Sequence, residues 1–108
     1  MKFNIENIGY TVLGQSIESW SIYKDRYRLN ILILAGVHGD EIEGMQLANA
    51  MIKSFGESNT ISINLKIIPC LNRDGFVYNT RANANDVDLN RNLPTNDWSP
   101  YVSNPRYK

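Results

Sequence analysis

The stretch that decides the fold is LNILILAGVHGDE, from Leu29 to Glu41. Residues 29–35 are almost all apolar and branched, which is typical of a strand buried on both faces of a sheet. The glycine-containing residues 36–40 predict a loop directly after that strand. At Glu41 the pattern becomes helical. The stretch therefore predicts a strand, a tight loop and the start of a helix, in that order.

An amphipathic helix is predicted from Glu41 onward. Its apolar residues recur at helical spacing over about four turns. They are Ile42, Met45, Leu47, Ala48, Met51, Ile52 and Phe55. Asp40 is expected to cap the N-terminus of this helix with its side chain, and Gly56 is expected to end it.

A second sheet strand is predicted at residues 61–68, which alternate between apolar and polar and then become continuously apolar before Pro69. Strand, loop, helix and strand form a βαβ unit, whose strands lie parallel and whose crossover is right-handed. Upstream, residues 16–23 alternate and predict an edge or meander strand. Residues 71–108 are rich in Asn, Asp, Gly and Pro and are predicted to be mostly loop. This order of elements indicates an α/β protein.

The composition limits the function classes. The 108 residues allow one small domain, and the 43% hydrophobic and 20% charged content is that of a soluble globular protein. Eleven basic residues balance eleven acidic ones, which argues against binding nucleic acid or an anionic membrane through bulk charge. Cys70 is the single cysteine, so no intramolecular disulfide forms. Residues 1–10 show no signal-peptide pattern, and we expect a cytoplasmic protein.

His38 and Glu41 form the first candidate site. They stand three positions apart, where the predicted strand ends and the helix begins. Ligand sites in open α/β sheets lie at the carboxyl ends of the strands, and imidazole and carboxylate both suit Zn²⁺. The alternative is that His38 makes a local hydrogen bond and Glu41 only complements the helix dipole. The spacing alone leaves both interpretations open.

The long polar loop holds the second candidate site, because so much irregular chain in a small domain usually serves a function. Arg81 and Arg91 lie in it among several asparagines. A guanidinium group suits a substrate carboxylate or a developing oxyanion. Asp88 is a natural partner for the second ring nitrogen of a metal-bound histidine. The alternative is a solvated loop in which Asn and Asp make local turns.

Three ordered motifs together resemble the zinc carboxypeptidase family, and within it the bacterial murein peptide amidases, which split the γ-D-glutamyl–diaminopimelate bond of peptidoglycan fragments. The motifs are HGDE at 38–41, PCLNRDG at 69–75 and RANANDVDLNRNLP at 81–94. Residues 13–17, LGQSI, resemble the first strand of that subfamily, and Trp98 fits its loop.

The resemblance implies a role for each matching residue. His38 and Glu41 would be ligands of one zinc ion, and Asp88 would accept a hydrogen bond from His38. A catalytic zinc site needs three protein ligands and a water, and His38 is the only histidine of the chain. The resemblance implies that the third ligand and the general-base Glu come from a later part of the family domain, supplied either by a continuing chain or by a partner.

The substrate-binding roles also come from the resemblance. Asn90 and Arg91 would bind the free carboxylate of a small peptide substrate, and Arg81 would be the catalytic residue that polarises the scissile carbonyl. Two departures leave these groups in place: Asp86 stands where the family commonly has Gly, in a turn expected to need a positive φ, and Arg73 replaces a common Pro.

The implied fold is a three-layer α/β/α sandwich with a mixed, mostly parallel sheet. Residues 1–108 would be the N-terminal portion of a single zinc-peptidase catalytic domain, incomplete at its C-terminus. The full-length protein would be a zinc metallopeptidase or amidase acting on murein peptides, with this chain alone inactive.

Three alternatives to that function stay open, and the oligomeric state is not predicted. The first, on the same fold, is an N-acyl amino acid deacylase similar to the desuccinylases and aspartoacylases. The second is an inactive fragment or binding module that keeps Asn90 and Arg91 without a competent metal site. A third, a nucleic-acid binder using Arg81 and Arg91, is disfavoured by the zero net charge.

Overall fold

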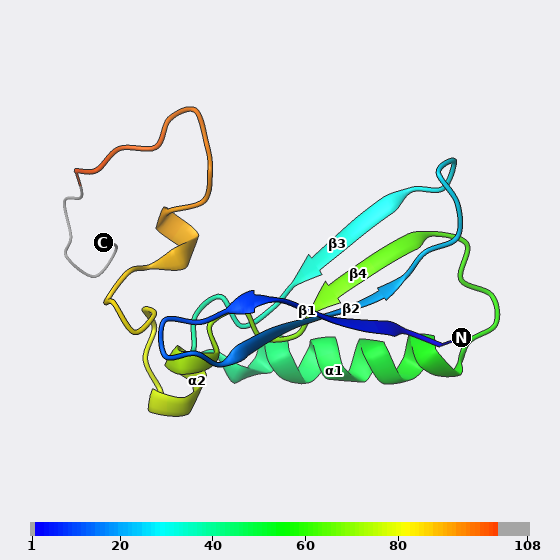
Figure 1. Ribbon diagram of the computed structural model, residues 1–108, viewed down its shortest axis with the longest axis horizontal. Coiled ribbons are helices and arrows are strands. Elements are labelled where there is room, and N and C mark those ends of the chain that lie inside the picture. Colours follow the sequence, from blue (N-terminus) through cyan, green and yellow to red (C-terminus); the bar gives the residue numbers. More distant parts are fainter. Residues whose placement is uncertain (1, 102–108) are drawn as a thin grey trace.

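The computed structural model describes residues 2–101, which form an α/β arrangement with one sheet (Figure 1). The strands are β1 (Asn4–Tyr10), β2 (Ser16–Ile22), β3 (Asn30–Leu34) and β4 (Asn64–Ile68). The helices are α1 (Ile42–Glu57) and α2 (Arg73–Tyr78), followed by a 3₁₀ turn at Leu89–Arg91. No helix within residues 2–101 is both long enough and apolar enough to span a bilayer.

The sheet is mixed, with the strand order β1-β2-β4-β3. β3 and β4 pair in parallel, which confirms the predicted parallel strands of the βαβ unit. β1 pairs with β2, and β2 with β4, in antiparallel fashion. The expected mostly parallel sheet is therefore wrong for the described residues. The tight turn between β1 and β2 accounts for their antiparallel pairing, since a connection that short joins only antiparallel strands.

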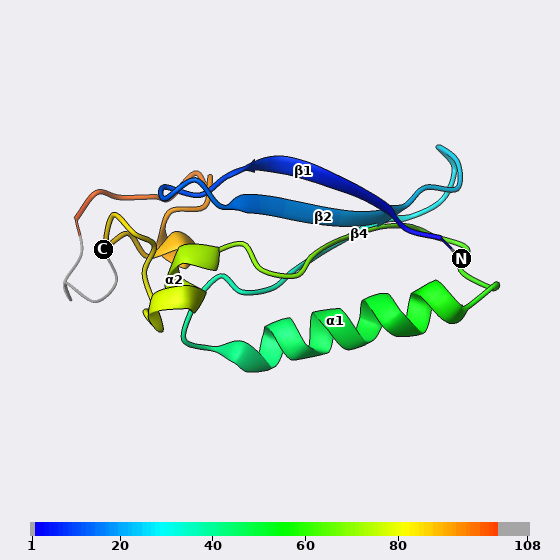
Figure 2. The same cartoon turned by 60° about the horizontal axis from the view of Figure 1, so that its bottom comes forward.

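One helical layer covers the sheet. α1 lies against one face, and α2 lies near the carboxyl ends of β3 and β4 (Figure 2). The core between α1 and the sheet contains Ala48 and the completely buried Ile67, with Met51 and Phe55 packed against them. Residues 2–101 thus form two of the three expected layers.

The buried strand is β4, not β3. Asn64, Leu65, Ile67 and Ile68 of β4 are all buried, whereas Leu32 of β3 is 60% exposed. The prediction that residues 29–35 are buried on both faces is therefore wrong for this chain. The cause is the topology, because β4 has a neighbour on each side while β3 stands at the edge of the sheet.

The limits of α1 and β4 also differ from expectation. α1 begins at Ile42, with Glu41 at the cap position and no side-chain cap, so the predicted Asp40 cap is wrong. The backbone N–H of Glu41 instead donates to the carbonyl of His38, in a turn that leaves Asp40 exposed. α1 ends at Glu57, just past Gly56. β4 starts at Asn64, opposite the first residue of β3, rather than at residue 61.

The segment after β4 is less irregular than predicted, because residues 73–78 form α2. Asn72 caps this helix by accepting from the backbone N–H of Gly75. Arg73 occupies the first helical position, where Pro is favoured because the N–H there needs no intrahelical partner. Asp86 has φ of 60°, the positive value that its turn was expected to require.

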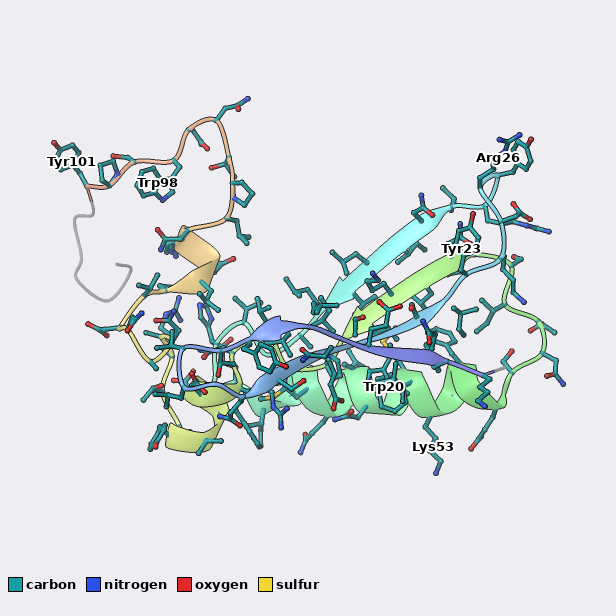
Figure 3. All side chains as sticks on the ribbon, viewed as in Figure 1. Trp20, Tyr23, Arg26, Lys53, Trp98 and Tyr101 are labelled. Atoms are coloured by element: carbon teal, nitrogen blue, oxygen red, sulfur yellow. The ribbon has the colours of Figure 1, made fainter. Side chains whose placement is uncertain are left out.

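The two tryptophans lie in different parts of the structure. Trp20 of β2 meets Phe3 edge-on, with ring centroids 6.0 Å apart. Trp98 and Tyr101 lie on an extended segment away from α1 and the strands (Figure 3). Trp98 is half exposed and donates from Nε1 to Oδ1 of Asn92 at 3.1 Å.

Candidate metal centre and its surroundings

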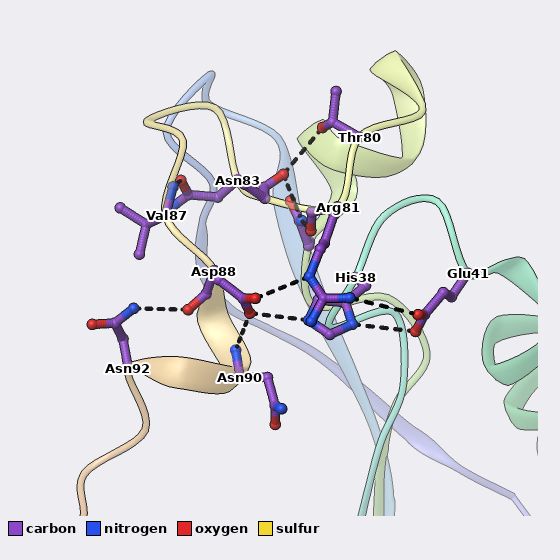
Figure 4. Close-up of polar contacts among 11 residues, drawn as sticks. His38, Glu41, Thr80, Arg81, Asn83, Val87, Asp88, Asn90 and Asn92 are labelled. Atoms are coloured by element: carbon purple, nitrogen blue, oxygen red, sulfur yellow. Dashed lines mark hydrogen bonds and ion pairs between the residues drawn. The ribbon is translucent and has the colours of Figure 1, made fainter. Parts of the chain in front are cut away.

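His38 and Glu41 face each other across the turn between β3 and α1 (Figure 4). His38 Nδ1 lies 3.2 Å from Glu41 Oε2. Two ligand atoms on one tetrahedral zinc ion, each about 2.0–2.1 Å from the metal, lie about 3.3 Å apart. The His38 side chain is 10% exposed and the Glu41 side chain 62%, so the pair opens to solvent on the Glu41 side. This separation and donor set fit two ligands of one zinc ion.

Asp88 fixes the opposite side of the His38 ring. His38 Nε2 lies 3.0 Å from Oδ1 of Asp88, whose side chain is completely buried. Donation from Nε2 to this carboxylate leaves a lone pair on Nδ1 of the neutral ring. That lone pair then faces an oxygen of Glu41 at 3.2 Å. Two lone pairs this close require a cation between them, either a proton on Nδ1 or a metal ion.

Asp88 remains ionised although it is buried. Burial raises the pKa of this carboxyl, but hydrogen bonds and charge from His38 and Arg81 outweigh burial and hold the pKa below its usual range. Arg81 Nε donates to Asp88 Oδ2 at 3.0 Å, and the backbone N–H of Asn90 donates to Oδ1 at 3.0 Å. A single carboxylate therefore orients both the histidine ring and the arginine side chain.

Arg81 lies beside both acidic residues. Besides its bond to Asp88, its Nη1 is 3.9 Å from Oε1 of Glu41, and its side chain is 18% exposed. Glu41, His38, Asp88 and Arg81 thus follow one another in a closed ring of polar contacts (Figure 4). The structure thus brings together the residues predicted from the sequence to be the metal ligands, the histidine partner and the catalytic arginine. Their roles stay predictions.

Asn90 and Arg91 lie in the 3₁₀ turn directly after Asp88, and both are exposed. Asp88 holds the turn by accepting from the backbone N–H of Asn90 through its side chain. Asn92 Nδ2 donates to the carbonyl of Asp88 at 2.7 Å. The turn therefore presents Asn90 and Arg91 at the border of the site, and their binding of a carboxylate stays a prediction.

Two buried polar residues of the second motif had no predicted role. Asp74 accepts from Thr11 Oγ1, the backbone N–H of Leu13 and Gln15 Nε2, at 2.8, 3.0 and 2.8 Å. Burial raises the pKa of Asp74, but these three donors outweigh burial and lower it. Asp74 thereby ties the β1–β2 turn to α2. The other residue is Asn72, whose signal in the sequence was the preference of Asn for helix caps.

Close backbone packing joins the His38 loop to α2. A Cβ atom added to Gly39 would overlap the backbone of Gly75 and Phe76. Gly39 is also buried. Any larger residue at this position would push the loop that carries His38 away from α2.

The described residues hold two candidate zinc ligands and no complete metal centre. Within residues 2–101, no cluster of three or more His, Cys, Asp or Glu side chains is placed to hold a metal ion. A catalytic zinc site takes three protein ligands and a water. As zinc ligands, His38 and Glu41 would therefore make up only part of a catalytic site.

Comparison with known proteins shows which family this chain belongs to. The family model described as zinc carboxypeptidase matches residues 2–107. Murein peptide amidase A of Escherichia coli K12 is 35% identical over 96 residues, which are 86% of this chain and 37% of that protein. This chain therefore spans little more than a third of that relative's length.

Solved structures show the same likeness. The murein-tripeptide amidase of Escherichia coli O157 superposes with a TM-score of 0.67 at 30% identity, covering 89% of this chain and 39% of that one. Carboxypeptidase A of Helicoverpa armigera superposes with a TM-score of 0.82 at 23% identity, covering 98% and 32%. At that identity the second likeness shows the fold alone.

Proposed function

Because this chain belongs to the zinc carboxypeptidase family, we propose that the full-length protein is a zinc-dependent amidase that acts on small murein peptides with a free carboxylate. Membership of this family does not by itself select the substrate. The choice of murein peptides rests on the 35% identity to murein peptide amidase A over most of this chain.

The observation that carries the proposal is the ring of contacts among Glu41, His38, Asp88 and Arg81. It places a carboxylate oxygen and an imidazole nitrogen at zinc-ligand separation. It also places the buried carboxylate of Asp88 beside the other ring nitrogen of His38, which would favour the tautomer that leaves Nδ1 free to bind a metal. A solvated loop would leave these groups dispersed, so the ring supports a functional site.

His38 and Glu41 would hold the zinc ion, together with a third ligand from outside residues 2–101. Bound zinc supplies a water of lowered pKa and polarises a carbonyl oxygen. Arg81, which Asp88 holds through Nε, would bring positive charge toward the oxygen of the scissile carbonyl. Asn90 and Arg91, on the adjoining turn, would bind the terminal carboxylate of the substrate.

The test is hydrolysis of a γ-D-glutamyl–diaminopimelate peptide by the full-length protein, with and without a zinc chelator. We expect zinc-dependent cleavage, and we expect Arg81→Ala to lower kcat by about 100-fold or more. Arg26→Ala is the matched control, because Arg26 is an exposed arginine that contacts Tyr27. Cleavage of N-acyl amino acids in place of the peptide would support a deacylase, and chelator-resistant cleavage would exclude the zinc mechanism.

A further inference from the structure

We propose that Asn72 is a positioning residue that sets the place of Arg81 relative to the loop carrying His38. The hydrogen bonds of Asn72 go to backbone groups and not to the charged side chains of the ring. It lies instead between the two backbone segments from which that ring is built. The inference rests on the proposed function at one point, which is the catalytic role of Arg81.

The side chain of Asn72 joins two segments. Its Nδ2 donates to the carbonyl oxygens of Arg81 and Ala82 at 3.2 and 3.0 Å. Its Oδ1 accepts from the backbone N–H of Gly75 at 2.9 Å. One amide group therefore fastens the Arg81 backbone to the first turn of α2.

The backbone of Asn72 joins a third segment. Its N–H donates to the carbonyl of Gly36 at 2.8 Å, and Gly36 lies two positions before His38. Its carbonyl accepts from the N–H of Phe76 at 3.0 Å, inside α2. The loop with His38, helix α2 and the segment with Arg81 thus meet at this one residue.

The burial of Asn72 makes the loss of these hydrogen bonds costly. Asn72 is 2% exposed, and water has little access to replace its amide. If the Nδ2 donor is lost, the carbonyl of Arg81 loses its bond to this buried side chain, whereas the carbonyl of Ala82 still accepts from Thr80 Oγ1. The Arg81 side chain would move with its backbone, and its bond to Asp88 would weaken.

The variant Asn72→Asp replaces the Nδ2 donor by an oxygen that repels the two carbonyls and keeps the helix cap. Asp has the shape of Asn and is an equally good helix cap, so the bond from Gly75 N–H is kept. What it loses is the donor to the two carbonyls. Thr80→Val is the matched control, because Thr80 Oγ1 also donates to the carbonyl of Ala82, at 3.1 Å, from an exposed position.

The measurement is solvent exchange of the Arg81 Nε–H proton, followed by NMR in the zinc-free chain. In Asn72→Asp we expect this exchange to be about tenfold faster than in the unaltered chain, with the exchange of the Gly75 amide unchanged. Thr80→Val should leave the Arg81 proton as it was. A folded Asn72→Asp chain with unchanged Arg81 exchange overturns the proposal, as does equal acceleration at Gly75, which indicates a general structural role.

A second measurement applies if Asn72→Asp does not fold. In the unaltered chain, the side-chain amide protons of Asn72 should exchange much more slowly than those of the exposed Asn59. Equal rates would overturn the proposal. Neither measurement needs zinc or catalytic turnover. Both therefore test the role of Asn72 even if the proposed function is wrong.

Discussion

His38 Nε2 lies 3.0 Å from Asp88 Oδ1, although 50 positions separate these residues in the sequence. The contact joins the loop after β3 to the polar segment after α2. It turns the other nitrogen of the ring toward Glu41, and it places the charge of a buried carboxylate behind a potential metal ligand. Much of the account of the site depends on this pair.

Replacing the charge behind His38 should weaken zinc binding. In Asp88→Asn the residue keeps its shape, but the negative charge that strengthens His38 as a ligand and orients Arg81 is gone. We expect zinc affinity to fall about ten- to a hundredfold, measured by titration of the chain. Asp86→Asn is the control, because Asp86 is exposed and Asn equally tolerates its positive φ. Equal zinc affinity in Asp88→Asn and the unaltered chain would contradict the assignment of Asp88.

The pH dependence of stability should depend on Asp74. Its pKa in the folded state is lowered below the ordinary value of 3.8, so its contribution to stability is fully present above that value and is lost as the pH falls through the folded pKa. Asp74→Asn should lower the free energy of unfolding by about 1–3 kcal/mol at pH 7. Urea unfolding should show this difference shrinking below pH 3.8. A difference that grows toward acid would have the wrong sign.

Replacing Gly39 and Gly44 by alanine should change the free energy of unfolding in opposite directions. Gly39→Ala places a methyl group against the backbone of Gly75 and should lower the free energy of unfolding by about 1–3 kcal/mol. Gly44, in α1, has only Ala35 Cβ near that position, at 4.0 Å. Gly44→Ala should raise stability by up to about 1 kcal/mol, because Ala is the better helix former. Thermal and urea unfolding of both variants check this, and equal effects would refute the close packing at Gly39.

The identity of the buried strand can be tested by truncating one side chain in each. Ile67→Ala in β4 should cost about 2–5 kcal/mol of unfolding free energy, because Ile67 is fully buried. Leu32→Ala in β3 should cost less than about 1 kcal/mol, because that side chain is 60% exposed. The comparison is made by urea unfolding of this chain. Similar losses at both positions would restore β3 as the buried strand.

The sequence predicts local features better than strand neighbours. The run at 29–35 and the apolar spacing from Ile42 onward predict β3 and α1, because such patterns reflect one element at a time. Which strand is central depends on pairing between distant segments. β4 is central because β2 joins it from the other side, and no local pattern at residues 61–68 indicates that.

The same distinction applies to the site. His38, Glu41, Arg81 and Asp88 were selected by residue type and by resemblance, and the structure brings them into contact. The positioning role of Asn72 was missed because its Nδ2 donates to two distant backbone carbonyls, and such contacts have no sequence signature. Its function becomes visible only when the segments that it joins are placed in space.

The most direct test of the central claim is ¹⁵N NMR of the His38 ring while zinc is added to the chain. Since His38 is the only histidine, its two ring nitrogens give an unambiguous pair of signals. We predict that Nε2 keeps its proton, bonded to Asp88, and that Nδ1 shifts as it binds zinc, with Glu41→Gln weakening the effect. Binding of zinc at Nε2, with loss of the proton there, would contradict the account.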